Sequence, residues 1–172
     1  KENWHAVAIS KTLNTEFLRI FVLRSGHTDK GKLAFENKGD PACDYDTTTS
    51  GNDGICAFVT SNSEVNDSRW HQAVATIDKE SRTMSLYLDG VLQGSAVADN
   101  DFTTSTNPLV LGRLNPTDTY WVGQIDEVRI YSKVLSQAEI QDLYSRQLGN
   151  FAGLPTDYSP VVGYWNLFGP TK

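Results

Sequence analysis

The sequence lacks the features that mark several large classes of protein. It has no apolar run near the roughly 20 residues that a helix needs to cross a bilayer, so membrane insertion is not expected. Its 15 lysines and arginines are outnumbered by 21 aspartates and glutamates, which gives a net charge of −6, and they form no cluster. A nucleic-acid interface needs clustered cations to neutralise phosphates, so nucleic acid is excluded as a partner. The 172 residues, 39% of them hydrophobic, suffice for one folded domain with its own core.

Cysteine is scarce as well, with Cys43 and Cys56 the only two in the chain. The residues between them are polar, small and turn-prone. A disulfide closing such a loop would stabilise the fold by roughly 3 kcal/mol, and it would require an oxidising compartment. Zinc is a poor alternative, because two cysteines lack two further ligands at finger-like spacing. The sequence therefore predicts a Cys43–Cys56 disulfide and an extracellular or cell-surface location.

What the sequence does contain is a series of short apolar segments separated by turn residues. Asp89-Gly90 is a strong hairpin signal between two of these segments. Many short strands at such spacing predict an all-β sandwich or barrel, and the alternation of polar and apolar residues predicts one buried and one wet face. The expected strands are residues 17–23, 32–36, 55–60, 70–78, 84–88, 91–98, 108–111, 124–131 and 161–165.

One short helix is expected near residues 136–146. Ser136 and Glu139 have the spacing of a capping box, in which each side chain bonds the other residue's backbone N–H. Ile140, Leu143 and Tyr144 follow at the spacing of a single apolar stripe. A helix of this kind can bury one side only, so we expect it on the rim of the sandwich.

Several segments together carry a resemblance to a known family. They share the order and spacing of the conserved strands of laminin G-like domains in the concanavalin A-like lectin/glucanase superfamily. The resemblance implies a two-sheet antiparallel jelly-roll sandwich. The matching segments are residues 69–78, which start with Arg69-Trp70-His71, and residues 85–92, 109–112, 120–123, 124–131 and 134–140.

The chain departs from the family pattern at its N-terminus, where the usual first strands are missing. A segment similar to the family's first strand, residues 161–165, lies near the C-terminus instead. We therefore expect a laminin G-like sandwich over residues 1–149 and an extension over residues 150–172. The strand in the extension either completes this sandwich, as in a circular permutation, or begins a following repeat.

The resemblance also bears on enzymatic activity, because related glucanases use paired carboxylates on one strand. Hydrolysis of a glycosidic bond needs an acid and a base or nucleophile on either side of that bond. Here Gln124 occupies the first carboxylate position, and Asp126 and Glu127 would point to opposite faces of a strand. The sequence predicts that the protein is not an enzyme and has no catalytic residues.

The resemblance further implies a possible calcium ion at the rim of the sandwich. Asp126 is the best single metal ligand, because the family's last strand often supplies an aspartate to calcium. Calcium requires six to eight oxygen ligands, and the family's other ligands come from the early strands that are missing here. A second acidic option is the cysteine loop, with Asp44, Asp46 and Asp53.

Aromatic residues divide into two groups. Trp70, Trp121 and Tyr131 occupy family core positions, so we expect them to pack inside. A second group lies in or near loops, where an aromatic face can stack on a sugar and polar neighbours can bond its hydroxyls. The predicted ligand-binding residues are Trp4, Tyr45, Arg113, Asn115 and Tyr120.

These observations favour a non-catalytic extracellular module, carbohydrate-binding or adhesive, within a larger secreted or surface protein. Its partner would be a glycan or an extracellular protein. The alternative is a structural or assembly domain without a small ligand, which could join neighbouring domains or copies of itself by strand addition. A glycoside hydrolase ranks last.

Overall fold

The structure is a computed structural model that describes residues 5–13, 16–23, 29–38, 56–98, 106–113, 120–149 and 161–165. Within these ranges the protein is built of short strands with one helix, as the sequence predicts. The helix is α1 (Gln137–Gly149). The strands are β1 (His5–Leu13), β2 (Glu16–Leu23), β3 (Lys32–Lys38), β4 (Cys56–Glu64), β5 (Ala73–Asp78), β6 (Thr83–Leu88), β7 (Val91–Val97), β8 (Leu109–Leu111), β9 (Val128–Tyr131) and β10 (Val161–Trp165).

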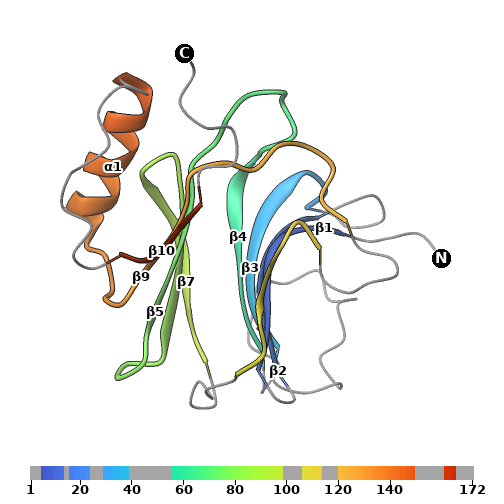
Figure 1. The fold of residues 1–172 in the computed structure, drawn as a ribbon, viewed down its shortest axis with the longest axis vertical. Helices are drawn as coiled ribbons and strands as arrows, with labels where there is room; N and C mark the ends of the chain where they lie inside the picture. Colours follow the sequence, from blue (N-terminus) through green and yellow to red (C-terminus); the bar gives the residue numbers. More distant parts are fainter. Residues whose placement is uncertain are drawn as a thin grey trace.

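Two antiparallel sheets form the layers of a sandwich (Figure 1). One sheet has the strand order β4-β3-β2-β1-β8, and the other has the order β5-β6-β7. The chain thus returns from the second sheet to place β8 beside β1, where Ile9 lies opposite Leu111. This crossing between layers is consistent with the jelly-roll sandwich expected from the sequence.

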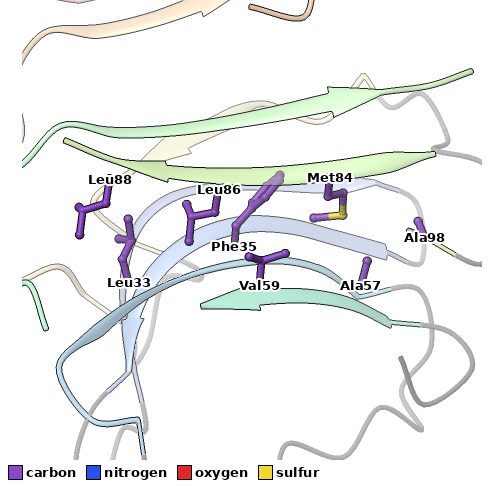
Figure 2. Close-up of a cluster of buried hydrophobic side chains, with 8 residues drawn as sticks. All are labelled: Leu33, Phe35, Ala57, Val59, Met84, Leu86, Leu88 and Ala98. Carbon is purple, nitrogen blue, oxygen red and sulfur yellow. The ribbon is translucent and has the colours of Figure 1, made fainter. Parts of the chain in front are cut away.

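The main core lies between the two sheets. Met84, Leu86 and Leu88 alternate along β6 and point toward β3 and β4, as Figure 2 shows. They meet buried side chains at Leu33, Phe35, Ala57 and Val59, with Ala98 at the edge. Burying each large aliphatic side chain stabilises the fold by about 1.5–3 kcal/mol.

The five-stranded sheet differs from the expected pattern of one buried and one wet face. Along β2, residues Ile20 and Val22 pack toward the main core, while Arg19 and Phe21 lie on the other face and are also buried. Glu36 lies opposite Arg19 on β3, is 1% exposed, and forms an ion pair with its guanidinium. Both faces of the sheet are therefore buried at this point although the sequence alternates. The ion pair offsets the cost of burying the two charged side chains.

Two expected strands are shorter than the sequence suggests. The segment expected to start at Trp70 enters the sheet only at Ala73. The segment expected to start at Gln124 is extended only from Val128, because Glu127 has a φ of 53°, which an extended strand does not allow. The interpretation of Asp126 and Glu127 as neighbours on a strand is therefore wrong.

Helix α1 has the predicted N-terminus. The Glu139 backbone N–H donates to Ser136 Oγ (3.3 Å), and the Ser136 N–H donates to Glu139 Oε2 (2.8 Å), which completes the capping box. Ile140 is fully buried. Gln137 Nε2 also donates to the carbonyl oxygen of Gly90 (2.6 Å), so α1 docks on the turn between β6 and β7. Among the described helical residues, no segment is long and apolar enough to cross a membrane.

The C-terminal strand β10 pairs with β9 of the same chain. The pairing is antiparallel, with Tyr164 opposite Arg129 and Trp165 opposite Val128. The two strands form a separate two-stranded sheet that lies near α1 in Figure 1. The division of the chain into residues 1–149 and 150–172 stays a prediction.

Candidate functional site

A loop follows β8, and the structure describes its two ends, at residues 111–113 and from residue 120 onward. Gly112, with a φ of +77°, turns the chain out of the strand, and its N–H donates to the Ala8 carbonyl oxygen (2.8 Å). The chain then returns at Tyr120, which forms an isolated antiparallel bridge with Arg113. The Trp121 N–H closes the base of the loop by donating to the Gly112 carbonyl oxygen (2.8 Å). Both ends of the loop are thus fixed to the five-stranded sheet.

This loop brings together two of the predicted ligand-binding residues, Arg113 and Tyr120. Residues directly opposite each other on antiparallel strands point to the same side, with Cβ atoms about 4.5–5.5 Å apart. Arg113 is exposed, and Tyr120 is 50% exposed. Ser10 Oγ donates to the Arg113 carbonyl oxygen (2.8 Å) and fixes the backbone at this point. The pair presents an aromatic face and a cationic donor to solvent.

The other predicted ligand-binding residues cannot be placed relative to this pair. Trp4, Tyr45 and Asn115 lie outside the described residues. Of the predicted disulfide, Cys43 is also outside them, and Cys56 is described only as the first residue of β4. These assignments stay predictions.

Asp126 is half-buried in the segment that leads into β9. The carboxylate of its neighbour Glu127 forms an ion pair with Arg129. In the described part of the chain, no group of three or more His, Cys, Asp or Glu side chains is arranged to hold a metal ion. The described side chains do not supply a calcium-ligand set around Asp126, so calcium at this residue stays a prediction.

The expectation that Trp70 packs inside is wrong, since its side chain is 61% exposed. The reason is local, because the chain has not yet entered β5 at this point and residues 65–72 form a loop. Trp121 and Tyr131, by contrast, are half-buried. The sequence motif alone could not reveal this difference. Trp70 directly precedes an alternating apolar segment, so it looks like the first residue of the strand that begins only at Ala73.

A cluster missed by the sequence analysis lies beside Trp70. His71 Nδ1 is 2.7 Å from Asp89 Oδ2, and His71 Nε2 is 3.0 Å from Asp67 Oδ1. Asp89 Oδ1 also accepts a hydrogen bond from the Gln72 backbone N–H (2.9 Å). We call Asp67, His71 and Asp89 the histidine clamp. It ties the loop after β4 to the start of β5 and to the turn between β6 and β7.

The histidine clamp shifts the protonation of its members. Burial lowers the pKa of His71, but hydrogen bonds and charge from Asp89 and Asp67 outweigh that effect and raise it overall. Hydrogen bonds from His71 and then Arg69 lower the pKa of Asp67 to about 2. An imidazolium between two carboxylates can donate from both ring nitrogens at once. The clamp thus stabilises the loop through charge-assisted hydrogen bonds.

No hydrolytic arrangement is evident among the described carboxylates. Gln124 is exposed, and Glu127 is held by Arg129. Glu36 is buried in its ion pair with Arg19, whose guanidinium also lies over the Phe21 ring (4.6 Å to the centroid). These contacts suit packing of the sheet rather than attack on a glycosidic bond, which needs two carboxyl groups flanking a substrate.

Two antiparallel layers with this strand order define a class of β-sandwich, the jelly roll. The chain belongs to the concanavalin A-like lectin/glucanases superfamily, whose family model matches residues 4–141. No curated protein matches the chain.

Two solved structures are similar to the chain. One is a "putative carbohydrate binding protein" from Bacteroides ovatus ATCC 8483, with a TM-score of 0.66 and 15% identity over 98% of this chain and 42% of that protein. The other is a fragment of an S-layer domain-containing protein from Clostridium thermocellum ATCC 27405, with a TM-score of 0.41 and 24% identity over 76% of this chain and 57% of that fragment. The chain therefore spans less than two thirds of either one. The first similarity shows the shared fold.

Proposed function

We propose that the chain is a non-catalytic glycan-binding module of a secreted or cell-surface protein. The observation that carries the proposal is the exposed pair of Arg113 and Tyr120 at the rim. The C–H groups of a pyranose pack on an aromatic face, and a guanidinium can donate to the flanking hydroxyls. The backbone at Arg113 and Tyr120 is held by their bridge and by the Ser10 hydrogen bond, so these two positions need little backbone ordering on binding.

Two further points support this proposal. A structure of the same fold is described as a putative carbohydrate binding protein, which favours this function by analogy of fold alone. Glu36, Glu127 and Asp89 are each held by a cationic or histidine partner. The module should therefore hold a glycan without cleaving it, in an oxidising environment that permits the Cys43–Cys56 disulfide.

A glycan array tests the proposal, with Tyr120→Ala as the loss-of-binding variant. The matched control is Val122→Ala, because Val122 is 77% exposed and lies two residues away. We expect the wild-type protein and V122A to retain the same glycans and Y120A to lose them. Absence of wild-type binding to every glycan, or equal binding by Y120A, would contradict the proposal.

The same array tests the calcium ion proposed at Asp126. If calcium bridges protein and glycan, chelation with EDTA should abolish binding and added Ca²⁺ should restore it. The Asp126→Asn variant should then resemble the chelated wild-type protein. Binding that persists unchanged in EDTA would show that the glycan site works without calcium.

A further inference from the structure

Trp70 is the largest exposed apolar side chain of the described residues and lies on the loop between β4 and β5. Its side chain is 61% exposed, and the neighbouring Arg69 side chain is 77% exposed. The loop lies between β4 and β5, at the same end of the sandwich as the segment that follows Tyr120 in Figure 1. Trp70 is not among the residues of the main core or those packed against it.

The backbone on both sides of Trp70 is held in place. On one side, Asp67 accepts hydrogen bonds from the Arg69 backbone N–H (3.0 Å) and from Arg69 Nε (2.5 Å). On the other side, the histidine clamp fixes His71. The backbone on both sides of Trp70 is therefore held before any ligand arrives, which lowers the entropy cost of binding.

The segment that leads to Trp70 carries polar donors and acceptors at Glu64, Asn66 and Arg69. Asn66 is exposed, and its side-chain amide lies beside Glu64, since a Cβ on Gly31 would be 2.9 Å from an oxygen of each. Arg69 uses Nε for Asp67, and a guanidinium has further N–H groups on its terminal nitrogens. The carboxylates of Glu64 and Asp67 disfavour a sulfated or phosphorylated ligand.

We propose that Trp70 is a second sugar-contacting platform, on which a neutral pyranose ring packs while Arg69 and Asn66 bond its hydroxyls. The proposal rests on the proposed function and extends it to a ligand class. Tyr120 follows β8 and Trp70 follows β4, which are the two edges of the five-stranded sheet. Four strand spacings separate these edges, roughly 19 Å. A ligand that touches both loops is therefore a neutral oligosaccharide of several rings rather than a monosaccharide.

Calorimetric titration with cellohexaose, xylohexaose and mannohexaose tests this platform. We expect Trp70→Ala to weaken binding of the preferred hexaose at least tenfold and Trp70→Phe to retain most of it, because phenylalanine keeps an aromatic face. The control is Val91→Ala, which removes another exposed apolar side chain (58% exposed) and should leave affinity unchanged. The Tm of each variant should stay within a few degrees of that of the wild-type protein.

The outcomes separate this inference from the proposed function. If Tyr120→Ala weakens hexaose binding and Trp70→Ala does not, the second platform is wrong and the proposed function stands. If Trp70→Ala and Val91→Ala weaken binding equally, the effect is not specific to the indole and the platform is again wrong. If the wild-type protein binds none of the hexaoses, the neutral-oligosaccharide class is wrong, and the glycan array decides the proposed function by itself.

Discussion

At the scale of single residues, the histidine clamp shows how a sequence motif can serve the fold rather than a ligand. His71 would look like a lone histidine in the sequence, yet its two ring nitrogens contact Asp67 and Asp89. Asp89 has a φ of 51° and precedes Gly90 in the turn between β6 and β7, which needs two residues with positive φ. The clamp therefore fixes a turn that the local sequence already favours.

We predict that the stabilisation from His71 depends on pH. The folded-state pKa of His71 is raised, so its contribution is fully present below its unfolded value near 6.5 and is lost as pH rises through the folded value. Neutral imidazole has a single N–H and can donate to only one of the two carboxylates. His71→Ala should lower the free energy of unfolding by about 1.5 kcal/mol at pH 5.5.

Urea unfolding of the wild-type protein and H71A at pH 5.5, 7 and 9 would check this. The gap between the two proteins should narrow as pH rises. A gap that is constant across the series would show that His71 stabilises the loop by packing rather than by charge. Asp67→Asn, which keeps the size of the side chain, should reduce the pH dependence while leaving the loop otherwise intact.

At the scale of elements, α1 shows how far local sequence can specify structure. The capping box between Ser136 and Glu139 formed as the sequence predicted, and Ile140 of the expected apolar stripe is fully buried. The surface on which the helix packs, by contrast, is determined by the tertiary structure. The Gly90 turn lies beneath it, and a Cβ on Gly90 would be 3.2 Å from Tyr144 Cβ, so a larger residue there would push the helix away.

Removal of the cap should destabilise the protein modestly. We expect Ser136→Ala to cost about 1 kcal/mol, because the Glu139 backbone N–H loses its side-chain acceptor. Lys133 and Ser136 hold the pKa of Glu139 at about 2, so its favourable contribution is lost only as pH falls toward that value. Thermal melts of S136A and wild type at pH 7 measure the cost, with Ser145→Ala as the control within the same helix. Equal melting temperatures would contradict the role of the cap.

At the scale of the whole molecule, the pairing of the C-terminal strand is the feature that the sequence left open. The strand that resembles the family's first strand, β10, is the last strand in the described chain and pairs with β9. The two strands form a sheet of their own rather than joining either layer, and both the permuted sandwich and the following repeat stay predictions.

We predict that deletion of residues 161–172 destabilises the protein. The deletion removes the antiparallel partner of β9 and leaves that strand's backbone groups without their pairing. Loss of these hydrogen bonds should lower the free energy of unfolding by roughly 3 kcal/mol. Thermal unfolding of the truncated and full chains measures the change. A truncated chain that melts at the same temperature would show that β10 belongs to another domain.

The Cys43–Cys56 disulfide is a second prediction at this scale. It would link the segment after β3 to the first residue of β4. Mass spectrometry of unreduced peptides should find Cys43 linked to Cys56, and reduction should lower stability by roughly 3 kcal/mol in the chain-entropy model. The Cys43→Ser and Cys56→Ser double variant should melt at the temperature of the reduced wild-type protein. Two free thiols in the unreduced protein would contradict this prediction.

The sequence by itself determined the class of fold and the positions of most elements. Its turn residues and alternating apolar segments predicted strands β2, β3, β6, β7 and β10 closely, since those signals depend on neighbouring residues alone. It also determined the cap of α1, because a capping box acts within four residues. Arg113 and Tyr120 were each predicted to bind ligand from their place in loops, and their bridge is a contact that only the tertiary structure shows.

Only the tertiary structure decided which residues near strand ends become exposed. Trp70 and Gln124 each precede an alternating segment that continues into a sheet, and the sequence signal does not show where hydrogen bonding to a partner begins. The sequence also did not reveal the histidine clamp. Asp67, His71 and Asp89 come into contact only once β5 and β6 have paired. A contact between segments far apart in the chain depends on strand register, and register is fixed by packing across the whole sandwich.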